Sequence, residues 1–219
     1  MKLLKEGGGI DNTHNNPSSN HRTIDEKDAS SAVVIANFGN QVTVQDTNNL
    51  QYRCPPRTKI DQLVAGDKVL IHHDKSGFDE DLTANIVAKL PRKNALSRPN
   101  SQKKLCPIAA NIDFILIVVA YTPTPQPELI DRYIVASEVL EVAPILVLNK
   151  SDLLKENTKA KESIQSLLAI YEELDYKIVA ASAKKHRTAK LKEVIKGKTS
   201  ILVGQSGVGK SSLINDLLS

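Results

Sequence analysis

The chain has 219 residues, of which 41% are hydrophobic and 25% charged, so it is expected to fold into one or two globular domains. Aromatic residues make up 4% and tryptophan is absent, so the core must consist mainly of Val, Ile, Leu and Ala. The net charge of +4 favours an anionic partner without identifying one. The longest strongly apolar run, residues 114–121, is too short to cross a bilayer, and Cys54 and Cys106 have the pattern of reduced thiols. We therefore expect a cytoplasmic location and no membrane partner.

The first 90 residues divide into two parts of different composition. Residues 1–30 are rich in Gly, Asn, Ser and charged residues with little to bury, which predicts a disordered tail. Residues 31–90 carry short β-rich stretches separated by turn signals such as Ala65-Gly66-Asp67. This density of short strands predicts a small all-β barrel.

The next segment, residues 91–104, is basic and contains no acidic residue. It also carries two prolines and several polar residues, so we expect a linker. Two interpretations stay open at this point. The segment is either a solvated connection or a contact to the phosphate backbone of a nucleic acid beside the barrel.

From Leu105 onward, continuous apolar runs alternate with amphipathic segments of helical period. The expected strands are FILIVVA (114–120), PILVLN (144–149), YKIVAAS (176–182) and TSILVG (199–204), and the expected helices lie within 127–142, 157–174 and 186–197 and begin again at 211. This alternation predicts an α/β domain over residues 105–219, with a parallel sheet covered on both faces.

The stretch GQSGVGKSS, residues 204–212, is typical of a phosphate-binding loop. It fits G-x-x-x-x-G-K-[ST], with a predicted strand before it and a predicted helix after it. Its glycines let backbone N–H groups converge on phosphate oxygens, and the N-terminus of the helix favours the same charge. Lys210 is expected to reach the β- and γ-phosphates, and Ser211 to ligate Mg²⁺. The predicted phosphate site comprises Gly204, Gln205, Ser206, Gly207, Val208, Gly209, Lys210, Ser211 and Ser212.

A second motif, Asn149-Lys150-Ser151-Asp152, directly follows a predicted strand. The Asp152 carboxylate can accept hydrogen bonds from the N1–H and the exocyclic amine of guanine together, whereas adenine offers no such pair of donors. Asn149 can link the base edge to the phosphate loop, and the aliphatic stem of Lys150 can cover the ring face. Taken alone, the motif is also compatible with a polar turn between a strand and a helix. Next to a phosphate loop in the same sheet, it favours guanine recognition.

A third motif, Ser182-Ala183-Lys184, follows another predicted strand. A small residue at this position lets a backbone N–H approach the guanine carbonyl. The tripeptide is not specific by itself, and its position gives it weight. Because ligands of open parallel sheets bind outside the carboxyl ends of the strands, we expect the three motifs to converge on one edge of the sheet.

The order of these motifs is unusual, because Asn149 precedes Gly204 by 55 positions (204 − 149). A circularly permuted chain can build the same site, since a sheet depends on which strands are neighbours. NKSD, then SAK, then GQSGVGKSS, behind a small β-barrel, closely resembles the RsgA family, the circularly permuted GTPases of small-ribosomal-subunit biogenesis. The matching stretches are 106–113, 130–154 and 199–215.

The resemblance implies an OB-fold for the first domain and a circularly permuted P-loop GTPase fold for the second. It also implies that GTP or GDP is bound with Mg²⁺ and that Lys210 and Ser211 are the catalytic residues. The 30S ribosomal subunit and its 16S rRNA are the implied partners, with hydrolysis stimulated by the subunit and a role in its late maturation. We expect the protein to be a monomer.

The sequence also departs from the family. Members continue past the phosphate loop with two switch segments, one carrying an Asp-x-x-Gly element, and then with a zinc-binding domain. Here Asp-x-x-Gly occurs only at residues 74–77, inside the predicted barrel, and there is no Cys/His cluster for zinc. We therefore expect a GTPase domain truncated after the phosphate loop, which binds guanine nucleotide weakly and hydrolyses it poorly. The alternative is a hydrolysis-deficient, guanine-nucleotide-dependent RNA-binding module, whereas Asp152 disfavours a P-loop ATPase.

OB-like barrels often bind RNA through one face of the sheet and its loops. The scarcity of aromatic residues here favours contact with the RNA backbone over base recognition. The candidate contacts are Arg53, Arg57, Lys59, Arg92, Lys93 and Arg98. The basic run 184–198 is either a second contact or a solvated helix face.

Overall fold

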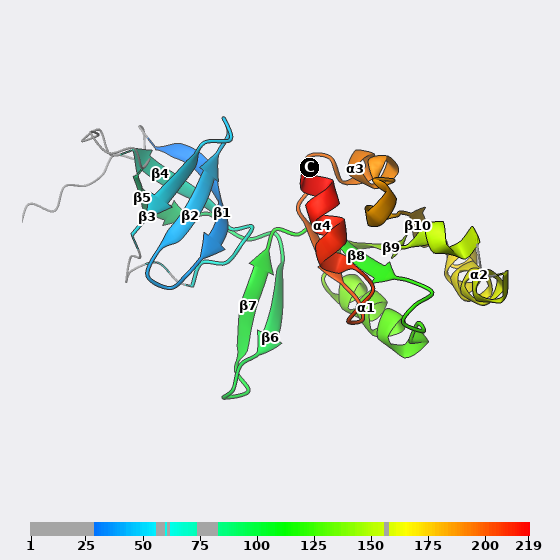
Figure 1. The fold of residues 1–219 in the computed structure, drawn as a ribbon. Coiled ribbons are helices and arrows are strands. Elements are labelled where there is room, and N and C mark those ends of the chain that lie inside the picture. Colours follow the sequence, from blue (N-terminus) through cyan, green and yellow to red (C-terminus); the bar gives the residue numbers. More distant parts are fainter. Residues whose placement is uncertain (1–28, 56–59, 61, 74–82, 156–157) are drawn as a thin grey trace, which may run out of the picture.

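The chain has two folded halves, a curled β-sheet and a layered α/β unit, with a β-hairpin between them (Figure 1). The computed structural model describes residues 29–55, 60, 62–73, 83–155 and 158–219. The predicted tail up to residue 28 lies outside these residues, as do Arg57, Lys59 and the turn at 74–77.

The first half is an antiparallel sheet in which buried and outward-facing residues alternate, as the sequence pattern predicts. Its strands are β1 (Ser30–Asn37), β2 (Val42–Asp46), β3 (Gln51–Cys54), β4 (Lys68–His73) and β5 (Ala84–Lys89), in the order β3-β2-β1-β4-β5. A bridge between Arg53 and Thr83 brings the two outer strands together, so the sheet curls toward a barrel. The inward residues, among them Val34, Val44 and Ile71, form a single core. The prediction of a small OB-like barrel is confirmed.

An antiparallel hairpin of β6 (Ala95–Pro99) and β7 (Leu105–Ala110) follows the barrel. We expected a linker over residues 91–104, but β6 forms within this segment. The two prolines of this hairpin do not prevent strand pairing, because each lies at a position where the hydrogen-bond ladder ends or shifts register. Pro99 is the last residue of β6, and Pro107 lies opposite Ser97, where the register shifts.

A buried ion pair ties the segment before this hairpin to the barrel. Asp67 is 0% exposed, and its carboxylate accepts hydrogen bonds from Arg92 Nε at 2.6 Å and Arg92 Nη2 at 2.8 Å. The same guanidinium donates to the Gln62 carbonyl, and the Val64 N–H donates to Asp67. Arg92, a predicted RNA contact, therefore has its charge paired with a buried carboxylate of the barrel, which disfavours that role.

The second half contains a parallel sheet in the order β10-β9-β8-β11. Its strands are β8 (Phe114–Val119), β9 (Ala143–Leu148), β10 (Lys177–Ala180) and β11 (Ser200–Val203). They fall within the four apolar runs predicted as strands, apart from Ala143 at the start of β9. The strand that leads to the phosphate loop, β11, pairs with β8 and ends the sheet, and its side chains are only partly buried.

Helices cover both faces of this sheet, as predicted. Residues such as Ile117 pack against α1 (Pro127–Val139) and α2 (Thr158–Glu173), whereas Leu116 faces α3 (Ala189–Ile195) and α4 (Lys210–Leu218). Two short 3₁₀ turns, η2 (Ser151–Lys155) and η3 (Ala183–Lys185), follow β9 and β10. Within the described parts of the chain, no helix has the length and apolar character needed to span a membrane.

We predict that Arg92→Ala destabilises the barrel strongly. The substitution leaves the Asp67 carboxylate buried without its cation, which typically costs about 3–5 kcal/mol of unfolding free energy. Urea unfolding followed by circular dichroism measures this loss. The matched control is Lys93→Ala, because Lys93 is the exposed neighbour and its removal is expected to change stability by less than about 0.5 kcal/mol. Equal unfolding midpoints for the two variants would contradict the prediction.

Candidate functional site

Three segments meet at the carboxyl edge of the parallel sheet. Residues 149–152 follow β9, residues 182–184 follow β10, and residues 204–209 follow β11. One cavity of about 430 Å³ is lined by members of all three segments and of the adjoining turns and helix, namely Asn149, Lys150, Asp152, Leu153, Ser182, Ala183, Lys184, Gly209 and Ser212. The convergence expected from the motif positions is present in the structure.

The phosphate loop needs glycine at two positions for steric reasons. At Gly204, which has φ +137°, a Cβ atom would lie 2.3 Å from the backbone oxygen of Val118 on the neighbouring strand β8. At Gly209, which has φ +91°, a Cβ atom would lie 2.6 Å from Nδ2 of Asn149. The first glycine lets the loop leave β11 against β8, and the second lets the loop approach the residues after β9.

The positive groups of the loop gather where α4 begins. Helix α4 starts at Lys210, so its N-terminal dipole faces the loop. Lys210 Nζ donates to the carbonyls of Gly204 and Gln205, at 2.9 Å each, which holds the ammonium group against the loop. Ser206, Gly207, Ser211 and Ser212 are exposed, whereas Val208 is buried and anchors the loop to the core.

Asn149 joins all three segments. Its side-chain Nδ2 donates to the Val208 carbonyl at 2.9 Å, and its Oδ1 accepts from the Ala183 backbone N–H at 3.3 Å. The residue is only 2% exposed, so these bonds form away from bulk water. Asn149 therefore fixes the phosphate loop relative to the loop after β10.

The side chain of Lys150 extends from the end of β9 toward the phosphate loop. It has a left-handed backbone (φ +58°), and its Nζ donates to the carbonyls of Gly207 at 2.8 Å and Thr122 at 3.0 Å. Its aliphatic stem consequently runs from the end of β9 to the phosphate loop. This path places the methylene groups of Lys150 along the wall of the cavity.

The carboxylate of Asp152 is held by a hydroxyl from the neighbouring loop. Ser182 Oγ donates to Asp152 Oδ1 at 2.5 Å. This bond is the main reason why the pKa of Asp152 is lowered, and the charges of Lys185 and Lys184 act in the same direction. Asp152 is thus held as an ionised acceptor at the edge of the cavity, while Ser151 follows Lys150 in the turn η2.

Comparison with known proteins agrees with this geometry. The family model described as RsgA GTPase matches residues 89–219. The chain belongs to the RsgA GTPase family. Proteins named small ribosomal subunit biogenesis GTPase RsgA are 42% identical in Pseudomonas putida and 40% identical in Marinobacter nauticus, each over 193 residues and 85% of this chain.

Solved structures show the same architecture. The crystal structure of YjeQ from Thermotoga maritima has a TM-score of 0.72 and 33% identity, covering 86% of this chain and 65% of that one. YloQ, described as a circularly permuted GTPase, has a TM-score of 0.68 and 25% identity, covering 89% of this chain and 66% of that one. The chain spans about half the length of the curated RsgA relatives it matches, 54% of the Pseudomonas putida protein.

The structure also adds residues that the motifs do not contain. Asp216 on α4 accepts hydrogen bonds from His186 and Thr188, which follow the Ser182–Lys184 motif. In the sequence, Asp216 has the pattern of an ordinary polar position in an amphipathic helix. No local signal pairs it with residues 28 and 30 positions earlier.

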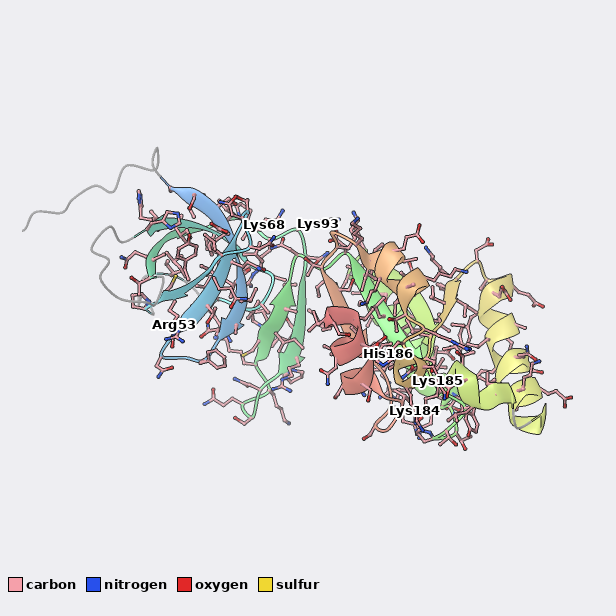
Figure 2. The ribbon with its side chains drawn as sticks, turned by 45° about the horizontal axis from the view of Figure 1, so that its top comes forward. Arg53, Lys68, Lys93, Lys184, Lys185 and His186 are labelled. Atoms are coloured by element: carbon pink, nitrogen blue, oxygen red, sulfur yellow. The ribbon has the colours of Figure 1, made fainter. Side chains whose placement is uncertain are left out.

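Of the predicted RNA contacts, Arg53, Lys93 and Arg98 are exposed. Figure 2 shows Lys93 where the barrel meets the hairpin and Arg53 at the opposite end of the barrel. No group of three or more His, Cys, Asp or Glu residues that could hold a metal ion occurs in the described part of the chain.

We predict that Gly204→Ala destabilises the RsgA-type domain much more than Gly197→Ala. Both glycines have positive φ, so an alanine is strained at either position, but a Cβ at residue 197 meets nothing within 4 Å. The expected cost is about 1 kcal/mol at residue 197 and about 3 kcal/mol or more at residue 204, where the methyl group collides with backbone. Chemical denaturation of both variants measures the difference. Equal costs would show that the loop can move away from β8.

Proposed function

We propose that this chain binds GTP and GDP with Mg²⁺ and acts, as part of an RsgA-type GTPase, in late maturation of the small ribosomal subunit. The observation that carries the proposal is the shared cavity where Asp152, Ala183 and the end of the phosphate loop, at Gly209 and Ser212, meet. Membership of the RsgA GTPase family supports the same function. The proposed location is the cytoplasm, and the proposed state is a monomer.

The base end of the cavity suits guanine. An ionised Asp152 accepts from the two adjacent donors of guanine, and adenine would leave it without them. Ala183, whose backbone N–H donates to Asn149 Oδ1 at 3.3 Å, is the small residue proposed to let the guanine carbonyl approach the loop. The Lys150 stem supports the ring face, and Ser151, Ser182 and Lys184 complete the proposed base site.

The phosphate end suits a nucleotide with Mg²⁺. Residues 204–209 supply backbone N–H donors, and Lys210 supplies the charge that neutralises the β- and γ-phosphates. The Ser211 side chain is exposed at the start of α4, so its hydroxyl is available as a ligand for Mg²⁺. When bound, the metal ion would polarise the phosphate oxygens.

Hydrolysis requires groups beyond those that bind phosphate. Lys210 and Ser211, the proposed catalytic residues, both act on phosphate charge, whereas phosphoryl transfer also needs a group that orients the attacking water. The second candidate is a guanine-nucleotide-dependent RNA-binding module with little turnover, in which Lys210 and Ser211 hold the phosphates without orienting water. GTP turnover measured with and without 30S subunits separates the two candidates.

The proposed partner is the 30S subunit, contacted through 16S rRNA. Arg53 on the outer face of β3, Lys93 and Arg98 provide exposed positive charge on the barrel and hairpin side of the molecule. The separation of Arg53 and Lys93 in Figure 2 suits an extended contact along an RNA backbone better than a single base pocket. Arg92 is not part of this proposal, because it pairs with Asp67.

We predict that Asp152→Asn changes base preference from guanine to xanthine. The amide offers a donor where xanthine has a carbonyl, and it no longer accepts both guanine donors. GTP affinity should fall by roughly 100-fold while XTP affinity rises. Titration of GTP, XTP and ATP measures this preference, with Asp175→Asn, an exposed change in the turn after α2, as the control. Unchanged GTP preference in Asp152→Asn would refute the base assignment.

We also predict that Lys93→Gln/Arg98→Gln weakens binding to 16S rRNA fragments and reduces its salt dependence. Each lost phosphate contact lowers the slope of log affinity against log salt by about 0.7–0.9. The control is Lys161→Gln/Lys177→Gln, which removes two exposed cations from the α/β unit. An equal slope in both double variants would remove the barrel and hairpin from the RNA interface.

A further inference from the structure

A second connection joins α4, the helix that follows the phosphate loop, to residues 182–187, here called the base-site loop. The residues that make this connection lie outside all three motifs. Asp216, one and a half turns into α4, is 8% exposed. Its two carboxylate oxygens accept from separate donors, His186 Nδ1 and Thr188 Oγ1, at 2.5 Å each. Figure 2 shows His186 beside α4, together with Lys184 and Lys185 of the base-site loop.

The donors sit at the end of a closed loop. Ser182 and Arg187 exchange backbone hydrogen bonds, with Ser182 N–H to Arg187 O at 3.2 Å and Arg187 N–H to Ser182 O at 3.0 Å. Residues 182–187 therefore form a loop whose first and last residues are joined by two backbone hydrogen bonds. Thr188 directly follows Arg187, so the hydrogen bond from Thr188 to Asp216 also restrains Ser182 through the Ser182–Arg187 pair.

Ser182 in turn orients the group that reads the base. Its hydroxyl donates to Asp152 Oδ1, and the next residue, Ala183, donates its N–H to Asn149. Asp216 on α4 is thus connected to the Asp152 carboxylate in three steps. Thr188 bonds to Asp216, the neighbouring Arg187 pairs with Ser182, and the Ser182 hydroxyl bonds to Asp152. Asn149 ties the same loop to the phosphate loop at Val208, on the other side.

We propose that Asp216 and Thr188 are positioning residues that hold the base-site loop at a fixed distance from the phosphate loop, so that Asp152 meets the exocyclic amine of guanine. This inference rests on the proposed guanine-nucleotide function. With Asn149 alone, the loop could pivot about one attachment. A second attachment on the helix that carries Lys210 removes that freedom before nucleotide binds.

The surroundings of the Asp216 carboxylate favour a lasting attachment between α4 and the base-site loop. Thr188 is 3% exposed, and although it stands at the start of α3, its hydroxyl makes no capping bond to that helix. The hydrogen bond from Thr188, followed by that from His186, lowers the pKa of Asp216. The carboxylate is consequently ionised and accepts both bonds at neutral pH, with the Lys192 charge acting in the same direction.

The test compares GTP with ITP, which lacks only the exocyclic amine. Thr188→Val removes the hydroxyl and keeps the shape of the side chain. Affinities for both nucleotides are measured by displacement of a fluorescent GDP, together with thermal unfolding. Thr188→Ser retains the hydroxyl, and Ser137→Ala removes an equally buried hydroxyl from α1, where Ser137 Oγ donates to Tyr133 O at 2.8 Å.

We expect Thr188→Val to lose about tenfold in GTP affinity and to lower the ratio of GTP to ITP affinity by at least about threefold, as for one hydrogen bond to a charged group. Thr188→Ser should keep the parent ratio, and Ser137→Ala should lower only the unfolding temperature. An unchanged ratio in Thr188→Val, whether or not both affinities fall, would overturn the positioning role.

A second variant covers the case in which Thr188→Val does not fold. Asp216→Asn keeps the size of the side chain and removes its charge, so it weakens the bonds from Thr188 and His186 together without opening a cavity. A lowered ratio of GTP to ITP affinity supports the proposal, and a parent-like ratio overturns it. If the parent chain itself binds GTP no better than ATP, both the proposed nucleotide function and the positioning role of Asp216 and Thr188 are refuted. If the parent prefers GTP, the variants test the positioning role alone.

Discussion

The buried amide of Asn149 is the interaction on which the nucleotide site depends. It is one side chain with a donor end on the phosphate loop and an acceptor end on the loop after β10. Because the amide is almost fully buried, removing either partner would leave a polar atom without water. The Cβ that Gly209 lacks would fall on this same amide, so the loop sequence and the strand-end sequence are fitted to each other.

This fit explains why the permuted order of the chain does no harm. The strand that carries the phosphate loop is the last of the sheet in sequence, yet it pairs with the first, β8, in parallel. All four strands therefore present their carboxyl ends at one edge, and the contacts that build the site are made there, between loops. Chain order enters only through the lengths of the connections, which helices on both faces provide.

The parts of the fold that the sequence predicts well are those set by local pattern. Continuous apolar runs became the strands of the parallel sheet, and the motifs placed their loops at its edge. The hairpin strand β6 was missed because its residues are half-buried or exposed, so ALSRP has no alternating pattern. Arg92 was assigned to RNA because a cation in a basic segment has no local sign of a buried partner 25 positions earlier.

The contacts between the barrel and the start of the α/β unit likewise have no local signal in the sequence. A flexible tether would have left the barrel free to turn against the GTPase domain. Instead, Ala110 donates its backbone N–H to Ala65 at 2.9 Å, and Asn111 donates its side-chain amide to Gly66 at 2.8 Å. Asn94 then bonds both the N–H and the carbonyl of Ile112, two residues before β8 begins.

These bonds combine one backbone pair, Ala110 with Ala65, with the side-chain amides of Asn94 and Asn111, each bonded to backbone groups. They lie next to the Asp67–Arg92 ion pair, so the barrel loop at residues 63–67 is held by charge on one side and by the start of the sheet on the other. The strand that follows these bonds, β8, runs beside the phosphate loop, because a Cβ at Gly204 would lie 2.3 Å from the backbone oxygen of Val118. The chain between the barrel and the parallel sheet is therefore held by backbone pairing and side-chain hydrogen bonds.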